Sequence, residues 1–260
     1  MTLAGKTALI TGAMTGIGYG IAEGFADAGL NLVMNGIREA ALVEPQRAAI
    51  EARGVRAMFY QADVSNADAV EAMLAAAAEE FGGVDIVVNN AGIQHVAPLE
   101  EFPREKWDAI IAVNLSAAFN VCRAAIPLMK QRGWGRIINI ASAHGLVASP
   151  FKSAYVASKH GVIGLTKTLG IELGEDNITC NAICPGYVLT PLVQEQIAAT
   201  AKARGITEEE VVKDVMLEAQ WTKKFVTAEQ LAATALFLAS EAAENITGAA
   251  IPVDGGWTAA

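Results

Sequence analysis

Short apolar runs rich in β-branched residues alternate along the chain with longer segments whose apolar residues recur every three or four positions. The short runs predict strands, and the longer segments predict helices. The predicted strands are Thr7–Thr11, Leu32–Met34, Ala57–Gln61, Ile86–Asn89, Arg136–Ala141, Thr179–Ile183 and Ala250–Val253. In the first predicted helix, Ile17, Ile21 and Phe25 share one face, and Gly29 follows as a stop signal. This alternation predicts an α/β protein with a doubly wound, seven-stranded parallel sheet and helices on both faces.

One stretch departs from this alternation. Between residues 190 and 227 the pattern predicts two amphipathic helices, Pro191–Ala203 and Thr207–Ala219, inserted before the last helix and strand. A small helical lid that moves over a site and a fixed surface flap both fit this insertion. No linker, repeat or low-complexity tract interrupts the sequence elsewhere, so we expect residues 1–260 to form a single domain.

Composition and charge exclude several classes of protein. The 260 residues are 53% hydrophobic and 18% charged, which is typical of a folded domain. The formal net charge of −9 repels nucleic acid and anionic membranes, so neither is an expected partner. Met1–Lys6 leads directly into a strand, and no apolar run has the length of a membrane span, so we expect a cytoplasmic protein. Cys122, Cys180 and Cys184 are predicted to be buried thiols, because their spacing fits no metal site.

A glycine-rich turn, Thr11-Gly12-Ala13-Met14-Thr15-Gly16-Ile17-Gly18, follows the first predicted strand. Glycines let the backbone approach a pyrophosphate at the positive end of a helix. The residues expected at the phosphates are Gly12, Thr15, Gly16, Ile17 and Gly18. Their spacing differs from the common Gly-x-Gly-x-x-Gly fingerprint, so the turn alone is a weak predictor. Asp63-Val64 and Asn89-Asn90-Ala91-Gly92 follow two further strands, which adds to the prediction of a nucleotide site.

A serine, a tyrosine and a lysine form a candidate catalytic group. Ser142 follows the fifth predicted strand, and Tyr155 and Lys159 stand one turn apart on one face of a predicted helix. Hydride transfer at a carbinol carbon needs a group that exchanges the hydroxyl proton. A phenol is too weak a base at neutral pH, so we expect the Lys159 ammonium to lower the pKa of Tyr155. Ser142 would then hold the substrate oxygen against Tyr155.

Together these motifs resemble the short-chain dehydrogenase/reductase family over essentially the whole chain. The resemblance implies a Rossmann-type fold, hydride transfer with a nicotinamide cofactor, and a water held by Asn114 in a proton relay to Lys159. The implied catalytic residues are Asn114, Ser142, Tyr155 and Lys159. The implied cofactor contacts beyond the glycine turn are Asp63 and Val64 at adenine, Asn90, Ala91 and Gly92 along the cleft, Tyr155 and Lys159, and Pro185, Gly186, Val188 and Thr190 at the nicotinamide end.

The choice of cofactor depends on the end of the second strand. NAD enzymes usually carry an acid there for the ribose 2′-hydroxyl, whereas NADP enzymes place an arginine near it. The sequence here is Asn35-Gly36-Ile37-Arg38. No acid is present, and Arg38 suits either a 2′-phosphate or an ordinary surface position. The family resemblance favours NAD, and NADP remains an alternative.

A set of polar residues predicts a carboxylate substrate. Lys152 lies near the start of the helix that carries Tyr155, where a cation opposes the helix dipole unless an anion sits beside it. His144 and Gln94 follow two predicted strand exits and would donate hydrogen bonds to the same anion. Gln196, in the predicted lid, would add a donor on closure. A loop histidine and solvated surface residues are the alternative reading of these positions.

Three segments, Gly92–His95, Ala141–Ser149 and Asp254–Thr258, resemble those of a group within the family, the bacterial D-3-hydroxybutyrate dehydrogenases. The resemblance implies reversible, NAD-dependent oxidation of (R)-3-hydroxybutyrate to acetoacetate by a homotetramer. The implied substrate-binding residues are Gln94, Ser142, His144, Lys152, Tyr155, Tyr187, Gln196 and Trp257. Tyr187 stands where that group is expected to carry Trp, and because both are large aromatic residues, the pocket is expected to stay small.

Three other functions stay open at this point. An NADPH-dependent 3-oxoacyl thioester reductase needs a basic docking surface, which 19 Lys and Arg against 28 Asp and Glu do not favour. A sugar or polyol dehydrogenase would use neutral polar contacts rather than a Lys and His pair. A non-catalytic nicotinamide-binding redox sensor would lack Tyr155 or Lys159, and both are present.

Overall fold

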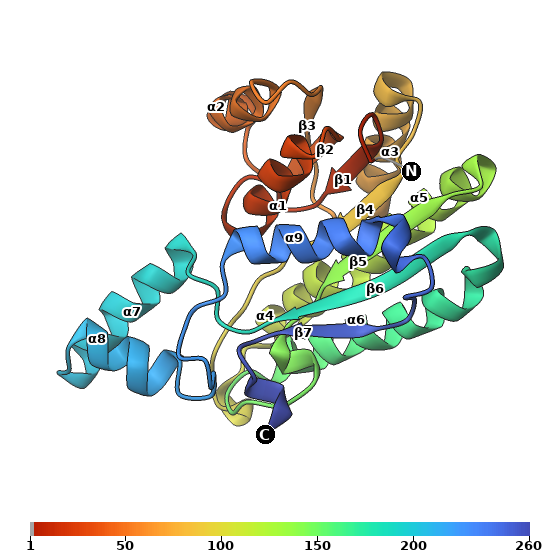
Figure 1. Cartoon of the computed structure of the whole chain (residues 1–260). Helices are drawn as coiled ribbons and strands as arrows, with labels where there is room; N and C mark the ends of the chain where they lie inside the picture. The colour runs from red at the N-terminus through yellow and green to blue at the C-terminus, as the bar shows by residue number, and fades with distance from the viewer. Residues whose placement is uncertain (1–2) are drawn as a thin grey trace.

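All seven strands belong to one parallel sheet (Figure 1). The computed structural model describes residues 3–260, apart from the side chains of Pro191, Leu192, Glu195, Gln196, Ala199, Ala203 and Arg204. The strands are β1 (Thr7–Ile10), β2 (Asn31–Gly36), β3 (Ala57–Gln61), β4 (Ile86–Asn89), β5 (Gly135–Ile140), β6 (Ile178–Pro185) and β7 (Ala250–Val253). They pair in the order β3-β2-β1-β4-β5-β6-β7. The predicted sheet is confirmed, with β2 and β6 longer at both ends than their apolar runs indicated.

Helices cover both faces of the sheet. The helices are α1 (Gly16–Asp27), α2 (Ala40–Glu51), α3 (Ala67–Phe81), α4 (Arg104–Ile111), α5 (Ala117–Arg132), α6 (Ser153–Glu172), α7 (Pro191–Arg204), α8 (Glu208–Val211) and α9 (Ala228–Ala239). One buried cluster joins α1, α2 and α9 to the sheet, through residues such as Phe25, Ile50 and Leu231. A second cluster joins α3, α5 and α6 to the opposite face, through residues such as Met73 and Val121. This arrangement is the doubly wound α/β fold that the sequence predicts.

The longest apolar helical run extends from Arg104 to Arg132, through α4, a π-turn at Ala112–Ser116, and α5. By length and composition alone it could cross a membrane, so the expectation that no segment reaches that length is wrong. Its apolar side has a different use, because Val121 and Met129 are fully buried against the sheet. The run therefore packs as a core helix of the α/β fold does.

The buried thiols are also as predicted. Cys122, Cys180 and Cys184 are all buried and unpaired in disulfides. Burial raises the pKa of Cys122 to about 12 and that of Cys184 to about 11, because an apolar surrounding disfavours the thiolate. These cysteines are thus unreactive core residues.

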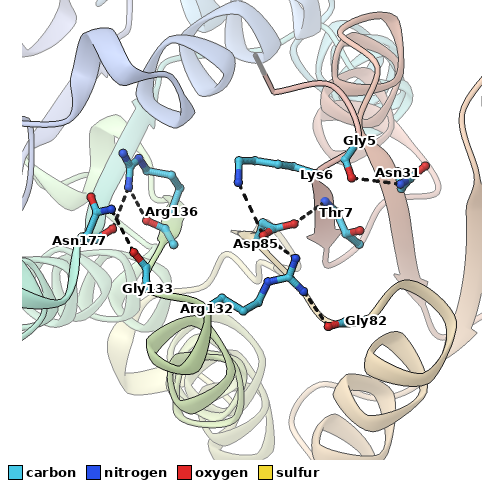
Figure 2. A network of polar contacts seen from close by, with 11 residues as sticks. Gly5, Lys6, Thr7, Asn31, Gly82, Asp85, Arg132, Gly133, Arg136 and Asn177 are labelled. Carbon is cyan, nitrogen blue, oxygen red and sulfur yellow. Dashed lines mark hydrogen bonds and ion pairs between the residues drawn. The ribbon is translucent and has the colours of Figure 1, made fainter. Parts of the chain in front are cut away.

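A polar network closes the amino ends of the strands (Figure 2). The Asp85 carboxylate, just before β4, accepts a hydrogen bond from the Thr7 N–H of β1 at 2.9 Å and pairs with Arg132 at 3.1 Å. Arg136, at the start of β5, is buried and donates to the Asn177 carbonyl at 3.1 Å, which lies just before β6. These contacts tie the amino edge of the sheet together and leave the carboxyl edge for a ligand.

The insertion before α9 projects from the body of the molecule as α7 and α8 (Figure 1). The second helix is shorter than predicted, since α8 gives way to a π-turn at Val212–Met216 and a tight loop after it. Ile197, Val211 and Leu217 are buried in a small core of the insertion, and Tyr187 packs against that core. The motion of this insertion as a lid stays a prediction.

Candidate active site

One large cleft lies at the carboxyl ends of the central strands. The chain leaves β1 toward β2 on one side and enters β4 on the other, which makes this point the topological switch of the sheet. The cleft is lined by Gly12, Thr15, Gly16, Ile17, Arg38, Asn90, Ala91, Gly92, Ile93, Gln94, Ile140, Ala141, Ser142, His144, Lys152, Tyr155, Lys159, Pro185, Gly186, Tyr187, Val188, Thr190, Val193 and Trp257. The structure therefore brings most of the sequence-predicted site residues into one cavity.

The glycine turn forms one wall of the cleft. Gly12 and Gly16 have φ angles of 63° and 56°, in the left-handed region that favours glycine. Gly18 does not line the cleft, because it packs behind the turn, where a Cβ would overlap the Gly12 carbonyl oxygen. Asn90 holds the turn in place by donating to the carbonyls of Thr11 and Gly12 at 2.9 and 3.1 Å. The open backbone at the start of α1 fits the pyrophosphate of a dinucleotide.

Tyr155, Ser142 and Lys159 lie together deeper in the cleft. Ser142 is close enough to Tyr155 to lower the pKa of the phenol, and its Oγ accepts a hydrogen bond from the His144 N–H at 3.1 Å. Lys159 is buried, and its Nζ donates to the Ile140 carbonyl at 2.8 Å. The same Nζ lies 5.6 Å from the centroid of the Tyr155 ring. The spacing of Tyr155 and Lys159 on α6 thus places both at the same end of β5.

The expected direction of the Tyr155 pKa shift is wrong for the free protein. Burial raises the pKa of Tyr155, the Ser142 hydrogen bond lowers it, and nearby Tyr187 raises it further. Burial also lowers the pKa of Lys159 to about 8, because the ammonium loses its water. Both groups are thus pushed toward their neutral forms. Sequence spacing could show that they are neighbours but not that burial is the largest cause of each pKa shift.

Asn114 lies behind this group rather than in the cleft. Its side chain accepts from the Ile93 N–H at 2.8 Å and donates to the Ile93 carbonyl at 2.9 Å and to Ser158 at 3.3 Å. The π-turn in which it sits displaces the residue from regular helical spacing. Asn114 and Lys159 line the same small internal cavity, so the structure places them side by side.

His144 and Lys152 meet at the far end of the cleft. The Lys152 Nζ lies 3.2 Å from the His144 Nε2, and the His144 Nδ1 is buried without a hydrogen-bond partner among the described residues. Burial, then the charges of Lys152 and His160, lower the pKa of His144 to about 4. The imidazole is therefore neutral near pH 7, and a lysine cation stands beside it. This pair is suited to an anionic group.

Two aromatic rings close the same end. Tyr187 and Trp257 stack with centroids 5.6 Å apart and planes 10° from parallel, and Trp257 also meets His144 edge-on at 4.9 Å. The Lys152 Nζ is 5.7 Å from the Tyr187 ring centroid. The result is a compact pocket with a cationic side and an apolar wall.

Besides Gly18 and Asn114, three predicted residues are not placed in the cleft. Asp63 is exposed, and its carboxylate accepts hydrogen bonds from the Ser65 N–H and hydroxyl at 2.9 and 2.7 Å. Val64 is buried in the core under α3 and α5. Gln196 lies in α7, but its side chain falls outside the described residues. The roles of these residues remain predictions.

Some lining residues carried no sequence signal. Ile93 and Val193 line the cleft, yet each lies in a segment where an apolar residue is ordinary. Gln220 is outside the cleft lining but accepts a hydrogen bond from the Tyr187 N–H, and nothing in the sequence around it indicates this contact. Arg38, considered above only as one of two alternatives, does line the cleft.

Comparisons with known proteins agree with this geometry. A family model described as enoyl-(acyl carrier protein) reductase matches residues 12–258. The chain is 56% identical over 257 residues to the D-beta-hydroxybutyrate dehydrogenase of Rhizobium meliloti, covering 98% of this chain and 99% of that one. It is 52% identical over 257 residues to the enzyme of the same name from Cupriavidus necator, covering 99% of both chains. It is 38% identical to the 3-oxoacyl-[acyl-carrier-protein] reductase of Chlamydia muridarum, covering 98% of both chains.

The fold, the cleft and its polar residues are those of an oxidoreductase that binds a nicotinamide cofactor. The chain belongs to the short-chain dehydrogenase/reductase family.

The buried ammonium of Lys159 has a cost in stability that can be measured. Its pKa of about 8 in the folded protein lies below the ordinary 10.5, so protonation at pH 7 opposes folding. Lys159→Met is expected to raise the free energy of unfolding at pH 7 by up to about 3 kcal/mol. The gap should shrink as the pH rises from about 8 to 10.5, where the wild-type lysine becomes neutral. Urea unfolding at several pH values checks this, with the exposed Lys167→Met as control, and a pH-independent gap would contradict it.

Proposed function

We propose that the protein catalyses the reversible oxidation of (R)-3-hydroxybutyrate to acetoacetate with NAD. The observation that carries this proposal is the meeting of Lys152 and His144 at 3.2 Å, in a pocket that also holds Tyr155. A cation beside a catalytic tyrosine favours a hydroxy acid over a neutral alcohol. Two relatives that are more than 50% identical to this chain, both called D-beta-hydroxybutyrate dehydrogenase, support the same substrate.

The cleft supplies the proton chemistry of this reaction. The bound nicotinamide is the hydride acceptor, and the residues of this chain do the rest. Ser142 and Tyr155 hold the substrate oxygen, and Tyr155 accepts the hydroxyl proton while the carbinol C–H bond releases its hydride. The products are a ketone, the reduced cofactor and one proton. In the reverse direction Tyr155 donates that proton to the ketone oxygen.

Lys159 and Asn114 complete the proton path in this proposal. The positive charges of the Lys159 ammonium and of the oxidised nicotinamide both favour phenolate at Tyr155, opposing the effect of burial. Lys159 would also hydrogen-bond the ribose hydroxyls of the cofactor. Asn114, beside Lys159 at the small internal cavity, would keep a water that carries the proton away.

His144, Lys152, Tyr187 and Trp257 form a pocket, called the acid pocket below, that would orient the substrate. Because the His144 imidazole is neutral, the Lys152 ammonium donates toward it in the free protein. A substrate carboxylate is a stronger acceptor and would take over the Lys152 hydrogen bond. Gln94 and Gln196 are proposed as further donors, and the Tyr187–Trp257 wall would confine the methyl end. This arrangement favours a short hydroxy acid.

For the cofactor, the glycine turn and the cleft fit a dinucleotide, and we propose NAD because of the resemblance to hydroxybutyrate dehydrogenases. One observation favours the alternative. Arg38 lines the cleft after β2, where a cation would stabilise the 2′-phosphate of NADP. The assay below therefore compares both cofactors.

We also propose a homotetramer in the cytoplasm. Phe119 on α5, Ile171 on α6 and Phe237 on α9 are exposed, and large apolar side chains on outer helix faces suit contact with further copies. Light scattering on the purified protein is expected to give the mass of four chains, and a monomer mass would refute the tetramer.

The function is tested by absorbance of the reduced nicotinamide. We expect rapid reduction of NAD with (R)-3-hydroxybutyrate, little with the (S)-isomer, and little with NADP. Turnover with NADP instead would assign Arg38 to the 2′-phosphate. Turnover of 3-oxoacyl thioesters in place of the hydroxy acid would refute the proposed substrate and support a reductase like the Chlamydia muridarum relative.

A further inference from the structure

Gln220 is a buried amide outside the cleft that has no role in the reaction described above. It lies in the loop between the insertion and α9, and its side chain is fully buried. Its Oε1 accepts a hydrogen bond from the Tyr187 N–H, and its Nε2 donates to the Lys224 carbonyl at 2.7 Å. Both ends of the amide are thus bonded to backbone, so the side chain fixes the separation of two segments.

The same side chain touches two glycines. A Cβ on Gly186, at the exit of β6, would overlap the Gln220 Oε1. A Cβ on Gly255, in the turn after β7, would lie 3.4 Å from the Gln220 Nε2. The Thr222 N–H also donates to the Gly255 carbonyl at 3.1 Å. Three segments that are distant in sequence therefore meet at Gln220: the exit of β6, the turn after β7, and the loop after the insertion.

Two of these segments carry the aromatic wall of the acid pocket. Tyr187 follows Gly186, and Trp257 comes two residues after Gly255. The backbone of Tyr187 is held on both sides, since its N–H donates to Gln220 and its carbonyl accepts from the Val226 N–H at 2.9 Å. The stacking of Tyr187 on Trp257, and the edge-on contact of Trp257 with His144, depend on how these backbones are placed.

We propose that Gln220 is a positioning residue that holds the stacked rings of Tyr187 and Trp257 in the place where they close the acid pocket. Its kinetic consequence rests on the proposed function, because the wall would confine the substrate beside His144 and Lys152. The side chains of a binding site keep their positions only when packing and hydrogen bonds hold them there. Loss of Gln220 should therefore weaken binding of the acid more than it slows hydride transfer or weakens cofactor binding.

Gln220→Met tests this, because it keeps the length of the side chain and removes both hydrogen bonds. Asn181→Leu is the matched control. Asn181 is a fully buried amide in β6 that donates to the Ile246 carbonyl at 2.6 Å and accepts from the Ala249 N–H at 3.1 Å, away from the cleft. Both variants lose two buried backbone hydrogen bonds, so a purely structural effect should be similar in the two.

In Gln220→Met we expect the KM for 3-hydroxybutyrate to rise about tenfold, with kcat and the NADH dissociation constant changed less. Asn181→Leu should keep the wild-type KM. An unchanged KM in a folded Gln220 variant, or an equal rise in Asn181→Leu, overturns the proposal.

A spectroscopic measurement separates this proposal from the proposed function. Stacked aromatic rings give a near-ultraviolet circular dichroism signal, and the part lost in Trp257→Phe belongs to Trp257 and its neighbours. We expect Gln220→Met to lose that part and Asn181→Leu to keep it. If the wild-type protein does not oxidise 3-hydroxybutyrate, the proposed function fails while this comparison still decides the role of Gln220. A circular dichroism signal retained in Gln220→Met then overturns the positioning role of Gln220.

Discussion

Replacing Tyr155 with Phe is expected to lower kcat by about 10²–10⁴-fold, the usual contribution of a positioned acid–base group. In the proposed mechanism the Tyr155 phenol exchanges a proton with a substrate that Ser142 holds, and both side chains line the cleft. Phe keeps the ring and therefore the packing against His144, whose centroid is 6.1 Å from that of Tyr155. Cofactor affinity and the free energy of unfolding should change little. Steady-state rates, NADH fluorescence titration and urea unfolding measure these three quantities.

A matched control is available elsewhere in the chain. Tyr19 in α1 is another partly buried tyrosine whose pKa burial raises, and it lies outside the cleft lining. Tyr19→Phe should retain wild-type kcat. Rapid turnover in Tyr155→Phe, or an equal loss in Tyr19→Phe, would show that the Tyr155 hydroxyl is not the acid–base group.

The fold was predictable because its signals are local and repeated. The strands are short apolar runs, and helices such as α1 and α3 carry an apolar stripe, so the alternation predicts a parallel sheet before any contact is known. Where the ends of the elements were predicted wrongly, the cause lay outside the apolar pattern of the segment. The end of α8 depends on a π-turn, and β2 and β6 are extended by pairing with neighbouring strands rather than by their own composition.

The candidate site was predictable to the extent that its residues follow strand ends. Ser142, Asn90 and Gly12 all lie at carboxyl ends of strands, which parallel pairing brings to one edge. Two properties needed the structure. The pKa values of Tyr155 and Lys159 depend on burial, which spacing does not report. The contact of Gln220 with Tyr187 joins residues 33 positions apart, and no periodicity links them.

Replacing Lys152 with Met is expected to raise the KM for 3-hydroxybutyrate by about 10–100-fold, because a hydrogen bond to a charged group contributes about 1.5–3 kcal/mol. The expected rise in KM depends on the negative charge of the substrate, so the test uses a neutral analogue. The methyl ester of 3-hydroxybutyrate cannot pair with an ammonium, and its KM should be nearly the same in wild type and variant. The ratio of the two KM values, measured by reduced-nicotinamide absorbance, isolates the contribution of the carboxylate.

A loss of folding stability cannot account for the expected rise in KM. Lys152 is at the N-cap of α6 with no capping hydrogen bond, where its charge opposes the helix dipole. Its removal should therefore stabilise the free protein slightly, by about 0.3–1 kcal/mol. The exposed Lys167→Met on the same helix changes the net charge equally and should leave both KM values unaltered. An unchanged KM for the acid in Lys152→Met would remove the cation from the substrate site and favour a neutral alcohol as substrate.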